Sequence, residues 1–361
     1  MIPCHRRRST QPKEHTVTRA EQNAAYFPNG IPQLWCPMIT HFSAAATPDP
    51  HRVHALMAHI APSVKGVLIP GSTGEGWDMS DTDILRLMEV VLERASTLGM
   101  HVLIGALKPT AVQTRASIEA TLKQLGSITG DSEPASAMRR SGVAGFTVCP
   151  PTGAALAQAE LKAGLEDVLA LGLPTALYQL PQVTRNEMEP ETVSDLAQRY
   201  QNFFLFKDTS GEDRVATAAL DYQDVFFVRG AEGGYSRWPR SAGGRYDGFL
   251  LSTANSFSAE LGEMLAHLHA GRQEEADRIS DRIARCVEIM FPLAGDLKAG
   301  NAFANANKIF DHLRAWGPNA EAHDPPMLYG GTRIPADMIT QGRTVMTENG
   351  FDLSVGYLGV G

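Results

Sequence analysis

Residues 66–76 read GVLIPGSTGEG, a short apolar run followed by a loop rich in glycine and hydroxyl side chains. Short apolar runs without alternation are typical of parallel strands that are buried on both faces. The same kind of run recurs along the chain, at residues 34–39, 101–105, 144–149, 175–179, 203–207, 225–230 and 248–252. The sequence therefore predicts eight short strands of a parallel sheet.

Amphipathic patterns separate most of these strands, at residues 50–60, 80–98, 110–125, 158–171, 190–200 and 258–270. Eight strands, most of them followed by a helix, predict a (β/α)8 TIM barrel. An open doubly wound sheet is the alternative, and it is weaker because the chain has no nucleotide-binding glycine fingerprint. Residues 126–140 interrupt the alternation and read as an insertion between the third helix and the fourth strand.

The two ends of the chain differ from this central part. Residues 1–29 are polar, carry three consecutive arginines and lack periodicity, so we expect a disordered N-terminal tail. A transit peptide is the alternative, and it would change the expected location from cytoplasmic to mitochondrial. Residues 30–272 form the predicted barrel and catalytic domain. Residues 273–361 form a predicted C-terminal helical extension, with helical patterns at 274–290, 299–316 and 335–348.

Composition excludes several classes of partner. The 361 residues include 32 basic and 40 acidic side chains, a net charge of −8, which disfavours nucleic acid and anionic membranes. No apolar run approaches the length of about 18 residues that a membrane span needs. The four cysteines are widely spaced without a C-x-x-C motif, so we expect no metal site, no disulfide framework and a reducing compartment.

Catalytic groups of a TIM barrel lie at the C-terminal ends of its strands. The loop Gly71–Gly76 follows the second strand, and its backbone N–H groups and hydroxyls can converge on an anion. An ordinary strand-to-helix turn is the alternative interpretation. The loop is not a phosphate-binding P-loop, because no Gly-Lys-Ser/Thr follows it.

Two further strand ends carry candidate catalytic side chains. Lys207, one of only eight lysines, directly follows the apolar run 203–206, so its ammonium must be paired or must lose its proton easily. Asp208 or Glu75 could pair with it; otherwise it suits Schiff-base formation. Tyr178 ends the fifth strand as a proton carrier or a packing residue. Together with the loop, these groups suit a 2-oxo acid.

In these motifs the sequence resembles the dihydrodipicolinate synthase / N-acetylneuraminate lyase family of class I aldolases, over residues 30–315. The family's ordered motifs stand here as Gly71–Glu75 (GSTGE), Tyr178–Pro181 (YQLP), Lys207–Gly211 (KDTSG), Gly230–Glu232 (GAE) and the strand-eight segment Gly248–Asn255.

The resemblance implies that Lys207 forms the Schiff base and that Tyr178 is the acid/base. It also implies that Ser72 and Thr73 bind the carboxylate of pyruvate or a pyruvate-derived moiety. Further substrate-binding positions are expected at Gly71, Gly230, Glu232 and Ser252. No metal or organic cofactor is expected, because the protonated imine is the electron sink. The partners expected are a small 2-oxo acid and other copies of this chain, as a homodimer or homotetramer.

Three positions depart from the family pattern. Thr152 stands at the end of the fourth strand, where the family has a relay tyrosine that crosses to a neighbouring subunit. Val183 replaces the arginine with which dihydrodipicolinate synthases bind their second substrate, although Arg185 lies nearby. Gln179 replaces the asparagine of the tyrosine motif. The lysine-biosynthesis reaction is therefore disfavoured, while imine chemistry is unaffected.

Several functions remain open from the sequence. The favoured hypothesis is an aldolase or hydro-lyase that acts on a 2-keto-3-deoxy sugar acid. A dihydrodipicolinate synthase proper and an aromatic hydratase-aldolase are alternatives, the latter with Leu180, Val183 and Trp238 lining its pocket. A catalytically weakened binding or regulatory barrel is the alternative from another class.

Overall fold

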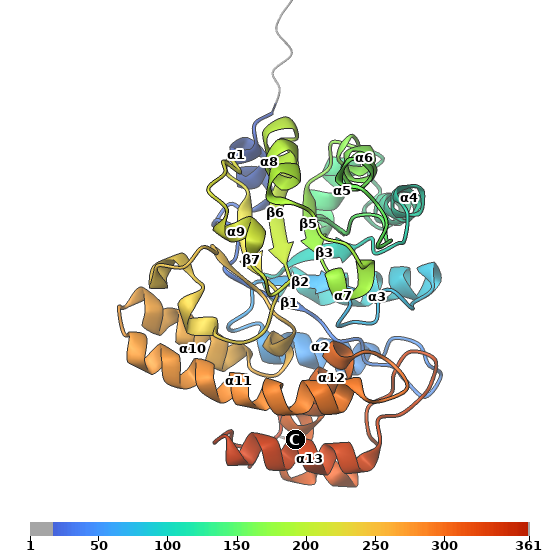
Figure 1. The fold of residues 1–361 in the computed structure, drawn as a ribbon. Helices are drawn as coiled ribbons and strands as arrows, with labels where there is room; N and C mark the ends of the chain where they lie inside the picture. The colour runs from blue at the N-terminus through green and yellow to red at the C-terminus, as the bar shows by residue number, and fades with distance from the viewer. Residues whose placement is uncertain (1–16, 360–361) are drawn as a thin grey trace, which may run out of the picture.

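The computed structural model describes residues 17–359 and contains a closed barrel of eight parallel strands in chain order (Figure 1). The predicted TIM barrel is confirmed, and the open sheet is wrong because the last strand pairs with the first, with Leu34 opposite Phe249. The strands are β1 (Leu34–Pro37), β2 (Gly66–Ile69), β3 (His101–Gly105), β4 (Val143–Val148), β5 (Thr175–Gln179), β6 (Phe203–Asp208), β7 (Phe226–Arg229) and β8 (Gly248–Leu250).

Helices cover the outside of the barrel, and nearly every strand residue is buried beneath them. The helices lie largely where the sequence predicts them. Their apolar residues recur at helical spacing and are buried. The α-helices are α1 (Arg19–Tyr26), α2 (Pro50–Ile60), α3 (Asp81–Ala95), α4 (Ala111–Thr129), α5 (Pro134–Ser141), α6 (Gln158–Leu169), α7 (Pro181–Thr184), α8 (Pro190–Arg199), α9 (Arg214–Thr217), α10 (Ser258–His269), α11 (Gln273–Gly295), α12 (Ala302–Trp316) and α13 (Ala336–Glu348). Short 3-10 helices are η1 (Tyr235–Arg237), η2 (Arg240–Ala242), η3 (Ser252–Asn255) and η4 (Gly317–Ala322).

The predicted disordered tail is wrong for residues 19–26, which form α1. A capping box begins this helix: the Thr18 hydroxyl accepts from the Glu21 N–H, and the Glu21 carboxylate accepts from the Thr18 N–H. Arg19 is buried, and its guanidinium donates to three backbone carbonyls near the end of α8 and the start of β6, those of Ala197, Tyr200 and Phe203. The rest of the tail prediction, at residues 1–16, lies outside the described residues.

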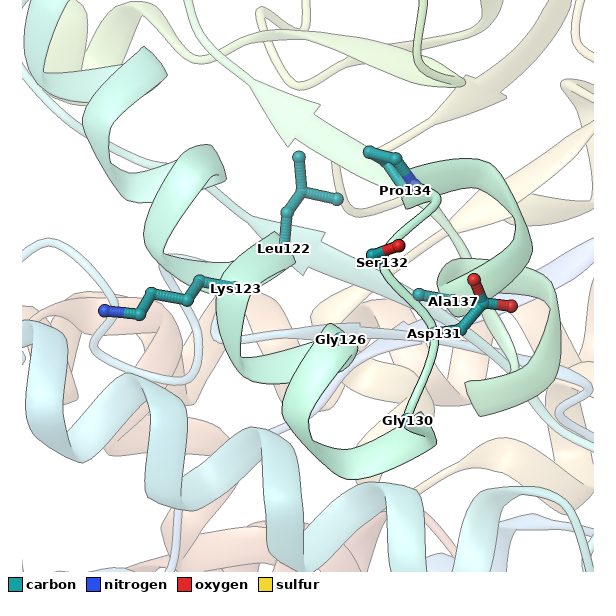
Figure 2. A pocket seen from close by; sticks show the side chains of 8 residues that line it. All are labelled: Leu122, Lys123, Gly126, Gly130, Asp131, Ser132, Pro134 and Ala137. Carbon is teal, nitrogen blue, oxygen red and sulfur yellow. The ribbon is translucent and has the colours of Figure 1, made fainter.

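The predicted insertion at residues 126–140 is helical rather than irregular. Helix α4 continues four residues past its predicted end, stops where Gly130 adopts a left-handed conformation (φ 68°), and is followed by α5. Figure 2 shows the hollow between these two helices, about 420 Å³ in volume, with Leu122 and Ala137 among its lining residues. The stretch thus packs on the outside of the barrel between β3 and β4.

The predicted C-terminal helical appendix is confirmed, and no strand follows β8 in the described chain. Helix α11 packs against α10, α12 and α13. Figure 1 shows these helices gathered on one side of the barrel, the side toward which the β6 arrow points. Within residues 17–359, no helix is both long enough and apolar enough to span a membrane.

The docking of α1 can be tested with Arg19→Met. Two buried carbonyls and one partly buried carbonyl lose a charged donor, so we expect the free energy of unfolding to fall by about 2–4 kcal/mol. Urea denaturation measures this change. Arg278→Met is the control, because the Arg278 side chain is 72% exposed in its pair with Glu274 and its loss should cost at most about 0.5 kcal/mol. Equal stabilities for the two variants would show that α1 does not dock as described.

Candidate active site

Lys207 and Tyr178 lie side by side at the C-terminal ends of β6 and β5. The two residues are register partners in the parallel sheet, so their side chains leave the sheet on the same face. The Lys207 Nζ lies 4.0 Å from the centre of the Tyr178 ring. Both side chains are buried, with exposed fractions of 3% and 2%. The structure therefore brings the two predicted catalytic residues together.

Burial lowers the pKa of Lys207 to about 7, against the weaker opposing effects of Cys149, Glu232 and Cys36. Within the described chain, Lys207 forms no ion pair. The two carboxylates that could have paired with it are engaged elsewhere: Asp208 accepts from the N–H and the hydroxyl of Ser210, and Glu75 pairs with a different lysine. At neutral pH a large share of Lys207 is thus the neutral amine, the form that attacks a carbonyl.

Tyr178 has the opposite electrostatic balance. Burial raises the pKa of its phenol above the ordinary value, and the hydroxyls of Thr209 and Ser72 act in the opposite direction. At neutral pH Tyr178 is therefore a neutral phenol with two hydroxyl groups beside it. Such a group can donate its proton and, as the phenolate that results, take a proton back in a later step.

The loop after β2 presents unpaired donors next to this pair. The N–H groups of Gly74 and Gly76 donate to the Gly71 carbonyl, which folds the loop on itself. No described residue accepts from the backbone N–H of Ser72 or Thr73, although both residues are buried. Two adjacent free N–H groups and two hydroxyls are what a carboxylate needs. The geometry agrees with the predicted anion-binding loop.

Gly230 is required by the position of Lys207. A Cβ at this residue would lie 2.6 Å from the Lys207 Cε and 2.5 Å from the Thr209 Oγ1. Because real Cβ atoms do not approach this closely, any larger side chain would displace the lysine. The glycine that follows β7 therefore leaves room for the Lys207 side chain.

Glu232 and Ser252 bond to each other. The Glu232 carboxylate accepts from the Ser252 hydroxyl (2.6 Å), and further donors to it are the N–H and hydroxyl of Thr253 and the hydroxyl of Tyr235. This cluster joins the loops after β7 and β8. Direct contact of Glu232 or Ser252 with a substrate stays a prediction, because most of the carboxylate's acceptor capacity is already used within the protein.

Sequence reasoning missed a support for the anion-binding loop from the C-terminal helices. Glu75, which has a left-handed backbone (φ 62°), pairs in the interior with Lys308 of α12. Its other oxygen accepts from the Tyr329 N–H at 2.8 Å. The Asn301 side chain, which caps α12, donates to the Ser72 carbonyl at 3.0 Å. The sequence predicted a helix at residues 299–316, but it did not indicate that this helix contacts the loop after β2.

Sequence reasoning also missed Trp77. This residue follows the GSTGE motif and packs against an apolar cluster beside the two catalytic candidates, made of Leu107, Cys149, Tyr178 and Leu180. Of the residues proposed to line an aromatic pocket, only Leu180 belongs to this cluster. Val183 is 36% exposed, and Trp238 packs against Arg229 and Tyr246 instead.

The relay tyrosine has no replacement at the end of β4. The Thr152 N–H donates to the Pro109 carbonyl at 2.9 Å, and its hydroxyl faces the same oxygen. Arg185 is exposed and has a left-handed backbone (φ 60°) at the end of α7. The described chain thus offers no buried arginine next to Val183.

Known proteins share both the sequence pattern and the fold. The chain matches the Dihydrodipicolinate synthetase family over residues 32–297. An uncharacterized DapA-like lyase of Rhizobium meliloti is 31% identical over 47% of this chain and 51% of its own length. A 4-hydroxy-tetrahydrodipicolinate synthase of Prosthecochloris aestuarii is 24% identical over 70% of this chain and 80% of its own. The chain therefore spans about half the length of the first relative and four-fifths of the second.

Solved structures of low identity support the same fold. YagE, a prophage protein of Escherichia coli K12 crystallised with pyruvate, superposes with a TM-score of 0.66 at 18% identity, covering 88% of this chain and 98% of its own. A lysine-bound enzyme from Cyanidioschyzon merolae, titled DHDPS, gives 0.64 at 21% identity with the same coverage. At these identities the likeness concerns the barrel and its C-terminal helices.

The support of the loop by α12 can be tested with Lys308→Met. Because this change leaves the Glu75 carboxylate buried without its cation, we expect the free energy of unfolding to fall by about 3–5 kcal/mol. Urea denaturation measures the loss, and adding Glu75→Gln should recover part of it. Lys162→Met, at a half-exposed pair with Asp195, is the control and should cost at most about 1 kcal/mol. A Lys308→Met variant as stable as this control would contradict a supporting ion pair.

Proposed function

This chain belongs to the dihydrodipicolinate synthetase family, and we propose that it is a lyase, an aldolase or hydro-lyase, that acts on a 2-oxo acid through a Schiff base on Lys207. One observation carries the proposal: Lys207 is buried without a carboxylate partner in the described chain, with a pKa lowered to about 7, against the ring of Tyr178. Few structural roles for a lysine require that arrangement.

The loop after β2 fixes the orientation of the substrate in this proposal. The free N–H groups of Ser72 and Thr73 and the Thr73 hydroxyl hold the carboxylate of pyruvate or of the pyruvate-derived part of a larger acid. The 2-oxo carbon then faces the Lys207 amine. The absence of a side chain at Gly230 leaves the space that the Lys207 side chain itself occupies in this arrangement.

Proton transfers are assigned to Tyr178. The neutral amine of Lys207 adds to the ketone, and the phenol gives its proton to the departing hydroxyl, which leaves as water and produces an iminium and a phenolate. For a 4-hydroxy-2-oxo acid, the phenolate takes the C4 hydroxyl proton while the C3–C4 bond breaks. That electron pair enters the enamine, and the same proton then goes to C3. Addition of water releases pyruvate and restores both side chains.

A 2-keto-3-deoxy sugar acid is the substrate class that we propose first. Its carboxylate and ketone fit the loop and Lys207, and its far end needs no cationic group. The exposure of Val183 and Arg185 supports this choice over dihydrodipicolinate synthesis, because no buried arginine stands where an acceptor carboxylate would be bound.

An aromatic hydroxy-oxo acid is a second candidate, and a specific observation favours it. The residues packed around Tyr178 are apolar: Trp77, Leu107, Cys149 and Leu180. An acceptor aldehyde rich in hydroxyls finds few partners on such a surface, whereas an aromatic one loses little on leaving water. A binding or regulatory protein is the remaining alternative, and the missing relay tyrosine is the feature in its favour.

Reductive trapping tests the Schiff base. With pyruvate and cyanoborohydride, a reduced pyruvyl mass should appear on the tryptic peptide that contains Lys207 and should be absent from Lys207→Ala and Lys207→Arg. Because the neutral amine attacks, the initial rate should rise about fivefold from pH 6 to 7 and about twofold from pH 7 to 8. Labelling of another lysine, or a rate still rising tenfold per unit above pH 8, would contradict the assignment.

A substrate panel separates the candidate reactions. Aspartate semialdehyde with pyruvate, 2-keto-3-deoxy acids, N-acetylneuraminate, and aromatic hydroxy-oxo acids are compared for pyruvate release and for dehydration. We expect cleavage or dehydration of the sugar acids or the aromatic acids. Condensation with aspartate semialdehyde should be at least about 10–100-fold poorer, because a charge-assisted hydrogen bond of about 1.5–3 kcal/mol is lost. No turnover of any compound, with Lys207 still trapped, would favour the binding protein.

A further inference from the structure

Trp77 contacts the proposed carboxylate-binding loop through a directed hydrogen bond. Its indole Nε1–H donates to the Ser72 Oγ at 2.9 Å. The Ser72 side chain is buried, and the Trp77 ring is half-buried against the cluster that contains Tyr178. The indole therefore contacts a hydroxyl group of the loop with its N–H and the cluster around the proposed acid/base with its ring.

The backbone of the loop is shaped to turn Trp77 back over Ser72. Glu75 has a left-handed φ of 62°, and the Gly76 N–H donates to the Gly71 carbonyl at 3.0 Å. A side chain at Gly76 would lie 2.9 Å from a backbone carbonyl, so only glycine fits this tight turn. The conformations of Glu75 and Gly76 fix the direction in which the backbone leaves the turn, and this direction places the indole of Trp77.

The donors and acceptors of Trp77, Ser72 and Tyr178 limit which of these side chains can donate to which. An indole N–H can only donate, whereas a serine hydroxyl has one proton and two acceptor sites. With the indole as donor, the proton of Ser72 is left to bond elsewhere. Burial raises the pKa of the Tyr178 phenol and the Ser72 hydroxyl acts against that rise, as a nearby donor would. The structure thus shows donation from Trp77 to Ser72, with the Trp77 ring packed against the cluster that contains Tyr178.

We propose that Trp77 is a positioning residue for proton transfer by Tyr178: its indole N–H holds the Ser72 hydroxyl in the orientation that donates to the phenol oxygen and stabilises the phenolate. This inference rests on the function proposed above. Beside Tyr178 and Ser72, it assigns a third side chain to proton transfer, and this side chain comes from the same chain, in the loop before α3. Thr152 takes no part, because its N–H and hydroxyl face the Pro109 carbonyl.

Deuterium exchange at C3 of pyruvate tests the proposal without knowledge of the physiological substrate. In D2O, the Lys207 iminium loses a C3 proton to Tyr178 to give the enamine, which takes a deuteron back, and NMR follows the loss of the methyl signal. Trp77→Phe keeps an aromatic ring but removes the donor. We expect exchange to slow about 3–10-fold, the effect of one neutral hydrogen bond, with trapping of Lys207 by pyruvate unchanged.

A double-mutant cycle distinguishes positioning from packing. Ser72→Ala removes the acceptor, so Trp77→Phe should slow exchange no further in that background. Trp35→Phe is the matched control, because it also loses an indole hydrogen bond, to the Pro32 carbonyl at the start of β1, and should leave exchange unchanged. Trp77→His retains a ring N–H and should exchange within about twofold of the parent. If Trp77→Phe does not fold, the exchange rate of Trp77→His is compared with that of the parent protein instead.

Three outcomes would overturn the inference while leaving the proposed function in place. The first is that Trp77→Phe is trapped by pyruvate and exchanges at the rates of the parent protein. The second is a loss that adds fully to that of Ser72→Ala, and the third is an equal loss in Trp77→His. Either of the last two would make Trp77 a packing residue. Failure of the parent protein to be trapped by pyruvate at Lys207 is a different result, and it would overturn the proposed function itself.

Discussion

A buried lysine amine that has no counter-ion within the described residues is the constraint on which the rest of this site depends. Transfer of Lys207 into the interior favours its neutral form, and a carboxylate alongside it would cancel that effect. The acidic side chains of the neighbouring strand ends are each satisfied by other partners: Glu75 by Lys308, Asp208 by Ser210, and Glu232 by the residues of η3 and η1. The lysine therefore keeps a low pKa in a site that contains several acids.

The C-terminal helices belong to this arrangement as much as the barrel does. Asn301 caps the beginning of α12, and Lys308 lies in its middle. Both side chains bond to the loop that presents Ser72 and Thr73. Because Glu75 occupies a left-handed conformation inside that loop, its pairing with Lys308 holds the strained turn in place. The appendix after the barrel thus supports the end of the fold at which Lys207 and Tyr178 lie.

The two sides of Tyr178 differ in chemistry, and this difference frames the question of substrate. Toward the loop after β2 lie hydroxyls and free N–H groups, which suit a carboxylate. Toward β3 and β4 lie Leu107 and Cys149, with Trp77 beside them, which suit an apolar group. The 2-oxo acid portion and the remainder of a substrate would accordingly meet surfaces of opposite polarity.

The sequence alone determined the barrel, because eight apolar runs with intervening amphipathic patterns are local signals that depend only on nearby residues. It also determined that Lys207, Tyr178 and the loop 71–76 lie at one end, because parallel strands share their direction. Only the tertiary structure decided that Lys207 has no carboxylate partner among residues 17–359 and that Lys308, 233 residues from Glu75, takes that carboxylate. The helical state of residues 19–26 was readable from the Thr18–Glu21 spacing, but the docking of Arg19 on β6 was not. Such pairings join segments that are distant in sequence, and their energies depend on burial and geometry that arise only once the chain has packed.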